Sequence, residues 1–409
     1  MKILIVTPRI PYPPYRGDKL KIFNLIKYLS KNHAVSLLTF YENETQLHGD
    51  FREIEKITHS AFAIRRTLAE SVLSVGKGIF SKLPFQVLFY QSEAFGEKLR
   101  EITRDNSYDV IYFHLIRTTQ YLKYVSGTSA VKVQDFTDAV SMYLSRYLMA
   151  EKNPVKKFGI GEEAKRIESY EKEARSFDAI YVCSEKDRDY LSGRYDGKKI
   201  SLLMNGVNLE TFSPIDIPYE PNRIIFTGNM PYFANSDAAV YFVREIFPLV
   251  LKEIPDARFY IVGQKPPQAV KDLASQSVIV TGFVEDIRAE YCKSAVNIAP
   301  IRFGAGTLNK VIESLALGIP VVSTSMAVSG LPAEIKSRIP AGDTPEEFAK
   351  LVVDVLRNRE KYAGESKQLS AVIREKLSWD TILSGFEQEL ELLSSRKRLS
   401  LSGAREQAI

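Results

Sequence analysis

Residues 299–322, APIRFGAGTLNKVIESLALGIPVV, constrain the fold more than any other part of the sequence. They start with the end of an apolar run and pass through Gly304, Ala305 and Gly306. A helical pattern follows, which a glycine and a proline close before a second apolar run. Strand, glycine-rich turn, helix and strand in this order predict a βαβ unit of a parallel sheet.

The turn and the helix start of this unit suit an anionic ligand. Glycines let the backbone come close to a ligand, and unpaired N–H groups at a helix start favour a phosphate. Lys310 and Glu313 are three residues apart, so we expect them on one helix face. The cation can neutralise a diphosphate, and the carboxylate can accept hydrogen bonds from ribose hydroxyls. An ordinary βαβ unit with an exposed Lys/Glu pair remains the alternative at this point.

Size and composition exclude several classes of protein. A chain of 409 residues is too long for one typical core and fits two α/β domains. A net charge of +5 is mild, and nucleic-acid binding would need a denser basic patch. Cys183 and Cys292 are too few and too far apart for a disulfide scaffold, so we expect reduced thiols. The four histidines have no metal-ligand spacing, so we expect no metal site.

The sequence predicts a cytoplasmic protein. No apolar run is long enough to span a bilayer, and the N-terminus reads as a buried strand without a cleavage site. Residues 65–91 mix basic and apolar side chains and leave two interpretations. We favour an amphipathic helical hairpin packed against its domain. Contact with the inner face of the membrane, or with a lipid-linked acceptor, is the alternative.

The first half alternates strands and helices as a doubly wound domain does, with strands at 2–7 and 34–40. No G-x-G-x-x-G follows the first strand. Gly17, in the loop there, either approaches a phosphate or sugar or is a turn glycine. His114 follows the strand 108–113, at the end where such domains display functional side chains. We therefore expect His114 to have a catalytic or sugar-binding role.

Two carboxylates, Asp135 and Asp138, follow the short strand 131–133. One could orient an acceptor hydroxyl, or both could cap the helix expected at 139–150. Ser184 reads as the N-cap of another helix.

Glycine recurs at the strand ends of the second half. Gly228, Gly263, Gly282 and Gly304 each follow an apolar run. Parallel strands end at one edge of a sheet, which is where α/β domains bind ligands. This recurrence favours the nucleotide interpretation of residues 299–322.

The second half also carries a family likeness, in the segments FTGNM, ARFYIVG and VIVTGFVEDIRAEYCKSAVNIAPIRFGAGTLNKVIESLALGIPVVST. They resemble the donor half of retaining glycosyltransferases of the GT-B fold, closest to the family 4 sugar transferases of bacterial exopolysaccharide clusters. VCSEKDRDYL, NGVNLETFSP and SWDTI extend the resemblance over nearly the whole chain.

The resemblance implies two Rossmann-like domains facing across a cleft. Residues 1–207 would form the acceptor side, completed by residues 383–409, and residues 208–382 would bind the donor. The implied reaction moves a hexose from a nucleotide-diphosphate sugar to a saccharide or lipid-linked saccharide. A UDP-sugar is favoured, with UDP-glucose as the first candidate, and neither cofactor nor metal is implied.

The resemblance also implies roles for the residues at positions that match the family's motifs. Glu313 would hold the ribose hydroxyls, Lys310 would face the diphosphate, and His114 would lie near the donor sugar. The donor nucleotide would also contact Gly228, Asn229, Gly263, Gly282, Phe283, Val284, Thr307, Leu308 and Asn309. The loop for the donor sugar and phosphates would contain Gly17, Gly304, Ala305 and Gly306.

The sequence departs from the family pattern at two places. Ala305 stands where the first Glu of the paired-Glu motif is usual, and Asn229 stands in a loop that usually carries Arg and Lys. The phosphate charge then falls on Lys310 and Arg302, which we expect to be catalytic, with Asp138 as the protein base if one acts. A nucleotide-sugar epimerase of the same fold and a non-catalytic donor- or glycan-binding protein are the alternatives.

Overall fold

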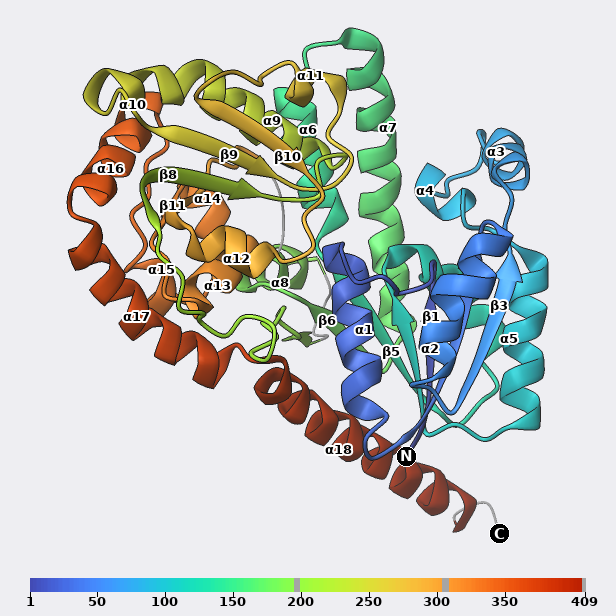
Figure 1. The fold of residues 1–409 in the computed structure, drawn as a ribbon. Helices are drawn as coiled ribbons and strands as arrows, with labels where there is room; N and C mark the ends of the chain where they lie inside the picture. The colour runs from blue at the N-terminus through green and yellow to red at the C-terminus, as the bar shows by residue number, and fades with distance from the viewer. Residues whose placement is uncertain (195–198, 304–308, 407–409) are drawn as a thin grey trace. The chain divides into compact units, whose positions relative to one another are not determined.

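A computed structural model describes residues 1–194, 199–303 and 309–406. The chain divides into two compact units: residues 1–203 with 383–409, and residues 204–382. Each unit is a parallel sheet with helices on both sides (Figure 1). Two Rossmann-like parallel sheets are what the sequence predicts.

The first unit contains a seven-stranded sheet in the order β3-β2-β1-β4-β5-β6-β7. Its neighbouring strands are parallel throughout. The strands are β1 (Lys2–Thr7), β2 (Ala34–Tyr41), β3 (Ser60–Arg65), β4 (Val110–His114), β5 (Val131–Thr137), β6 (Ala179–Val182) and β7 (Ile200–Leu202). The helices are α1 (Gly17–Leu29), α2 (Phe51–Glu55), α3 (Leu68–Lys77), α4 (Phe85–Leu88), α5 (Glu93–Asp105), α6 (Val140–Ala150), α7 (Pro154–Tyr170) and α8 (Glu185–Ser192).

The second unit contains a five-stranded parallel sheet in the order β10-β9-β8-β11-β12. Its strands are β8 (Glu220–Thr227), β9 (Arg258–Val262), β10 (Val278–Gly282), β11 (Ser294–Ala299) and β12 (Val321–Ser323). The helices are α9 (Phe233–Tyr241), α10 (Phe247–Glu253), α11 (Gln268–Lys271), α12 (Ile287–Cys292), α13 (Asn309–Ala316), α14 (Ser325–Val328), α15 (Ala333–Lys336), α16 (Pro345–Arg357) and α17 (Arg359–Lys376).

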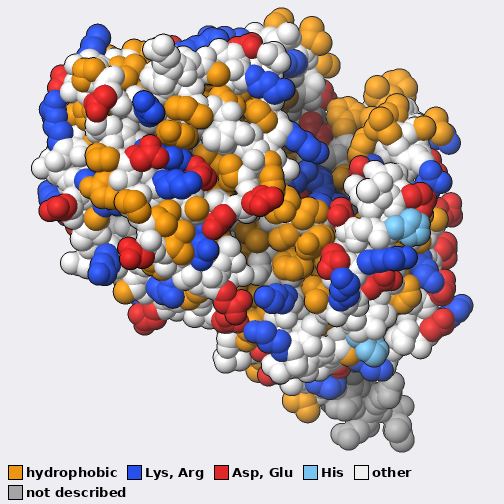
Figure 2. All heavy atoms as spheres, in the orientation of Figure 1, with side chains coloured by type: hydrophobic (Ala, Val, Ile, Leu, Met, Phe, Trp, Pro, Cys, Tyr) orange, Lys and Arg blue, Asp and Glu red, His pale blue; other side chains and the backbone are white. Residues whose placement is uncertain are grey.

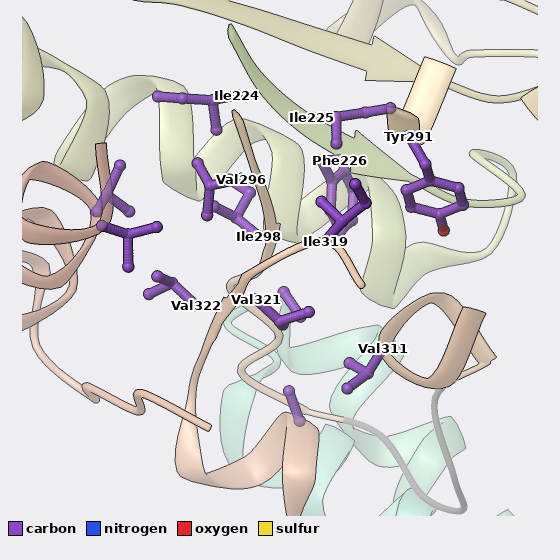
Figure 3. Close-up of a cluster of buried hydrophobic side chains, with 14 of the residues drawn as sticks. Ile224, Ile225, Phe226, Tyr291, Val296, Ile298, Val311, Ile319, Val321 and Val322 are labelled. Atoms are coloured by element: carbon purple, nitrogen blue, oxygen red, sulfur yellow. The ribbon is translucent and has the colours of Figure 1, made fainter. Parts of the chain in front are cut away.

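The core of the second unit forms where the apolar strands meet the helices. Figure 3 shows Phe226 of β8, Val296 of β11 and Val311 of α13 in one buried cluster. Strands buried on both faces read as continuous apolar runs, which is why the sequence pattern locates them well. This core fixes α13 against β11 and so positions the side chains at its start.

The last helix, α18 (Trp379–Glu406), starts in the second unit and continues in the first. Glu387 accepts a hydrogen bond from the Tyr28 hydroxyl at 3.2 Å, and Glu389 accepts one from the Tyr181 hydroxyl at 2.6 Å. Lys397 pairs with Asp178 at 2.6 Å. These contacts attach residues after 382 to the first sheet.

Candidate functional site

The glycines at the carboxyl ends of β8 and β9 bring two backbone segments into direct contact. A Cβ on Gly263 would lie 1.8 Å from the carbonyl oxygen of Gly228. A Cβ on Gly228 would lie 2.8 Å from the side chain of Asn235. A side chain at Gly263 would require a backbone shift and one at Gly228 would displace Asn235, so glycine at both positions allows the close packing of these two segments.

Lys310 lies at the start of α13, beside this edge, and is only 7% exposed. Its Nζ donates to the Asn235 side-chain oxygen at 2.7 Å and lies 4.0 Å from the centroid of the Phe226 ring. Asn235 also donates to the backbone oxygen of Asn229 at 3.0 Å. The side-chain partners of the ammonium group are therefore neutral, and the carboxylate of Glu313 acts on it only from beyond hydrogen-bonding distance.

Glu313 lies one turn further along α13. It accepts a hydrogen bond from the Tyr291 hydroxyl at 3.3 Å, and that hydroxyl lies 2.6 Å from the Thr227 hydroxyl at the end of β8. Tyr291 is fully buried and so fixes the orientation of the carboxylate. A carboxylate held in this way has oxygen lone pairs left to accept from vicinal hydroxyls.

Burial moves both groups toward neutrality. It lowers the pKa of Lys310 to about 7, against the opposing charge of Glu313. It raises the pKa of Glu313 to about 7, against the hydrogen bond from Tyr291 and the charge of Lys310. Pairs of titratable groups with pKa values shifted by burial are concentrated at functional sites.

Arg302, expected to share the phosphate charge, is already paired. It makes two hydrogen bonds to the Asp237 carboxylate of α9, at 3.1 and 2.6 Å, and lies 4.3 Å from the Tyr241 ring centroid. Any contact with a phosphate would have to compete with Asp237. Lys310 is the cation of this edge without a carboxylate at hydrogen-bonding distance among the described residues.

The other expected donor residues lie around the same edge. Gly282 ends β10 with a φ of +72°, and Phe283 after it is largely exposed, with Val284 half-buried. The side-chain oxygen of Asn309, at the start of α13, is buried without a hydrogen-bond partner among the described residues. Gly304, Ala305, Gly306, Thr307 and Leu308 lie outside the described residues.

His114 ends β4 at the corresponding edge of the first sheet and is 1% exposed. Its Nδ1 lies 3.6 Å from an oxygen of Asp135, beyond hydrogen-bond length. Neither ring nitrogen has a hydrogen-bond partner among the described residues. Two unsatisfied nitrogens at a strand end leave the imidazole available to a bound group.

Asp135 holds a buried ion pair instead of a free carboxylate. It contacts the Lys21 ammonium at 2.9 Å, the Tyr112 hydroxyl, and the backbone N–H of Thr137 at 2.7 Å. Burial opposes ionisation, but the charge of Lys21 outweighs it and holds the pKa of Asp135 well below its usual range. The helix-capping interpretation is wrong, because Ala139 is the N-cap of α6 and no side chain caps it.

Asp138 lies beside Cys183 and Asp187, whose ligand atoms come within 4.8 Å of one another. Its carboxylate accepts from the Cys183 thiol at 3.3 Å. Burial first, and then the charge of Asp187, raise the pKa of Asp138 to about 7. Ser184 caps α8 as expected, accepting from the N–H of Asp187 at 3.1 Å.

The backbone is strained beside both of these groups. Leu115 follows His114 with a φ of +66°, and Thr137 precedes Asp138 with a φ of +64°. Such values are costly for residues other than glycine and gather at functional sites. Gly17 starts α1 with open space around it, so nothing in its surroundings requires glycine.

Asn235, Tyr291 and Lys21 are the residues that sequence reasoning missed. Each acts through a partner distant in the chain: Lys310 lies 75 residues from Asn235, and Asp135 lies 114 residues from Lys21. In the sequence, Lys21 looks like one polar position of an amphipathic helix. The neighbouring residues therefore do not indicate that its side chain is buried.

Comparison with known proteins relates most of the second unit to a protein family. Residues 221–358 match the sequence profile of the family described as "Glycosyl transferases group 1". These residues belong to the group 1 glycosyl transferases. The matched segment runs from β8 to the end of α16 and includes Lys310 and Glu313.

Whole-chain similarities agree with this glycosyl transferase domain. An uncharacterised 44.6 kDa protein from the cps region of Klebsiella pneumoniae is 22% identical over 375 residues, covering 87% of this chain and 91% of that protein. Sucrose-phosphate synthase from Thermosynechococcus elongatus superposes with a TM-score of 0.70 at 14% identity, covering 97% and 100% of the two chains. HepE from Anabaena, in complex with UDP and glucose, superposes with a TM-score of 0.66 at 12% identity, covering 96% and 99%.

Proposed function

We propose that the protein is a retaining glycosyltransferase that moves a hexose from a UDP-sugar, UDP-glucose first, to a hydroxyl of a saccharide or lipid-linked saccharide. The observation that carries the proposal is the pair of buried Lys310 and half-buried Glu313, one turn apart at the carboxyl edge of the second sheet. The group 1 match over residues 221–358 supports the reaction class. The solved complex of HepE with UDP and glucose supports the nucleotide.

Breaking the anomeric bond leaves negative charge on the departing diphosphate. Lys310 and the N–H groups at the start of α13 would stabilise that charge as it develops. Lys310 suits this role, because its hydrogen-bond partner is a neutral amide and no carboxylate among the described residues makes a salt bridge with it. These groups would balance the charge without a divalent cation, so activity should persist in the presence of EDTA.

The ribose would be held by Glu313. Its carboxylate can accept from both vicinal hydroxyls while Tyr291 holds it in place. Gly282, Phe283 and Val284 would line the base. Backbone N–H groups near the turn would serve the sugar hydroxyls in place of the carboxylate that Ala305 lacks.

In the first unit, His114 and Asp138 are the groups proposed to act on the sugar and the acceptor. His114 would donate to a donor-sugar hydroxyl through a ring nitrogen that has no hydrogen-bond partner among the described residues. For retention, the acceptor approaches the face that the diphosphate leaves, and a phosphate oxygen can take its proton. Asp138, with a pKa of about 7, is the protein group best suited to take the proton instead.

The similarity to a protein of a cps region supports a role in cell-surface polysaccharide synthesis. No helix among the described residues has the length and apolar content that crossing a bilayer requires.

The segment from α3 to α4 supports a peripheral contact with an anionic bilayer. It does not pack its apolar face as the favoured sequence interpretation expects: Leu68, Val72, Leu73 and Phe80 are exposed, and Phe80 is 98% exposed. Hydrophobic side chains cover the corresponding area in Figure 2. Lys77 and Lys82 flank them, which complements anionic lipid headgroups.

Cosedimentation with vesicles tests the membrane contact. We expect binding to vesicles containing phosphatidylglycerol, weak binding to pure phosphatidylcholine, and loss of binding in Phe80→Asp. Leu392→Asp is the matched control. Leu392 is, like Phe80, an exposed apolar side chain of the first unit, but it lies on α18. Equal binding by both variants would contradict the contact.

A panel of donors separates the proposed reaction from its alternatives. UDP-glucose, UDP-galactose, UDP-N-acetylglucosamine and GDP-mannose are each incubated with the protein, with and without a glycan acceptor. Release of the nucleoside diphosphate from a UDP-sugar, lost in Lys310→Met, supports transfer. A new epimer with the nucleotide still attached would indicate an epimerase, and stabilisation by donor without turnover would indicate a non-catalytic binding protein.

A further inference from the structure

Three arginines from separate elements of the first unit converge on Tyr90. Arg9, after β1, donates to the Tyr90 hydroxyl at 2.9 Å. Arg66, after β3, and Arg117, after β4, lie with their guanidinium carbons 4.4 and 5.4 Å from the centroid of the Tyr90 ring. All three follow the carboxyl ends of parallel strands, the edge where α/β domains bind ligands.

The carboxylates beside these arginines are too few to balance them. Asp18 is shared by Arg9 at 3.2 Å and by a fourth arginine, Arg16, at 3.3 Å. Glu42 pairs with Arg66 at 2.5 Å. The guanidinium cluster, defined as Arg9, Arg16, Arg66 and Arg117, therefore meets two carboxylates among the described residues.

Arg117 is the member of the cluster without a carboxylate at salt-bridge distance among the described residues. Its Nε donates to the neutral side-chain oxygen of Gln86 at 3.2 Å, and it forms no salt bridge within the described part of the chain. Burial first, and then the charge of Arg9, lower the pKa of Arg117. A half-buried guanidinium beside a second one is unfavourable unless an anion joins them.

Asp18 links the cluster to His114. Burial opposes its ionisation, but the charges of Arg9, Arg16, His114 and Arg117 outweigh burial and lower its pKa. His114 ends β4 three residues before Arg117, and both of its buried ring nitrogens lack hydrogen-bond partners among the described residues. This edge of the first sheet therefore carries excess positive charge, together with the buried His114 ring, whose nitrogens have no hydrogen-bond partner among the described residues.

We propose that the guanidinium cluster binds an anionic oxygen group of the acceptor, either a phosphate of a lipid-linked saccharide or a carboxylate of an acidic saccharide. Guanidinium groups match both anions through paired N–H donors. The acceptor assignment rests on the proposed function, because the second unit has its own cation for the donor diphosphate in Lys310. The excess of two guanidinium groups is what the anion would neutralise.

Calorimetry on the full-length chain, with UDP present at saturation, tests the proposal with two probes. Inorganic pyrophosphate represents the phosphate source and glucuronate the carboxylate source. We expect one probe to bind, and Arg117→Gln and Arg16→Gln each to weaken it at least about tenfold. Arg117→Lys should keep part of the affinity, because it keeps the charge. Arg16 is half-exposed, so its variant tests the site even if Arg117→Gln does not fold.

Arg104→Gln is the matched control, because Arg104 is a surface arginine of the first unit whose salt bridge among the described residues is with Asp105. Unchanged probe affinity in both cluster variants would overturn the proposal. An equal loss of UDP affinity in those variants would overturn the acceptor assignment and place the donor diphosphate there instead. A failure of the proposed function would give a different result. UDP would then not bind, or its affinity would not depend on Glu313, while the affinity for the probe would still depend on Arg117.

Discussion

Lys310 and Glu313 lie one turn apart on α13, and burial brings the pKa values of both side chains to about 7. Without ligand, Lys310 has an amide and an aromatic ring as neighbours, and Glu313 has a buried tyrosine. Each group is therefore poorly compensated when charged. A diphosphate and a ribose would supply the missing partners.

We expect the affinity for UDP-glucose to be highest near neutral pH. Binding needs a protonated Lys310, which is lost as the pH rises above about 7, and an ionised Glu313, which is lost as the pH falls below about 7. Beyond these points the affinity should fall by up to about tenfold per pH unit. Calorimetry across pH should show the alkaline fall abolished in Lys310→Met and the acidic fall abolished in Glu313→Gln. Identical profiles in all three proteins would contradict this assignment.

The same shifts predict how stability depends on pH. The pKa of Lys310 is lowered from 10.5, so its charged form destabilises the folded state at neutral and lower pH, and this cost fades as the pH rises toward 10.5. Lys310→Met should therefore have a higher Tm than the wild-type chain at pH 7, and this difference in Tm should shrink as the pH rises. Thermal unfolding at several pH values measures the difference. A difference that stays constant would mean that Lys310 titrates normally.

Gly263→Ala should destabilise the second unit more than Gly282→Ala. At Gly263 the new Cβ meets the Gly228 carbonyl oxygen at 1.8 Å, so backbone must shift. At Gly282 there is open space, and the cost is that of a φ of +72°, about 1–2 kcal/mol. Gly364→Ala is the control, because Gly364 lies in α17 with nothing nearby and should stabilise by about 0.5–1 kcal/mol. Urea unfolding ranks the variants by their unfolding free energies. Equal losses in Gly263→Ala and Gly282→Ala would contradict the close approach of Gly263 to the Gly228 carbonyl.

Asp135→Ala should cost about 3–5 kcal/mol of unfolding free energy, because it leaves the buried Lys21 ammonium without its carboxylate. Lys21→Met with Asp135→Leu should recover most of that loss by removing both charges. Urea unfolding of the single and double variants measures the coupling. A double variant as unstable as the single one would show that the packing around Asp135, and not the charge, dominates.

The features that the sequence could predict are local in the chain. The strands of both sheets read as apolar runs, and the pair Lys310 and Glu313 is visible because both residues lie on one helix turn. The βα alternation was sufficient to predict two doubly wound units, and the predicted strands at 2–7 and 34–40 agree with β1 and β2.

The features that the sequence could not predict depend on distant contacts or on side-chain exposure. β3 is half-buried at the edge of its sheet and has no strong alternation, so its sequence SAFAIR does not identify it. The apolar side chains of α3 gave an amphipathic pattern, but a pattern does not say whether that face packs on the domain. The pairing of Arg302 with Asp237 joins residues 65 positions apart and could come only from the fold.

The affinity of Glu313→Gln for UDP measures whether α13 binds the donor nucleotide. The substitution keeps the size of the side chain and its contact with Tyr291 but removes the charge that would accept from the ribose hydroxyls. Glu334→Gln is the control, because Glu334 pairs with Lys376 on the surface of the same unit. We expect calorimetry at neutral pH to show a loss of roughly tenfold to a hundredfold in Glu313→Gln and no change in the control. Unchanged UDP affinity in Glu313→Gln would contradict the placement of the donor nucleotide on α13.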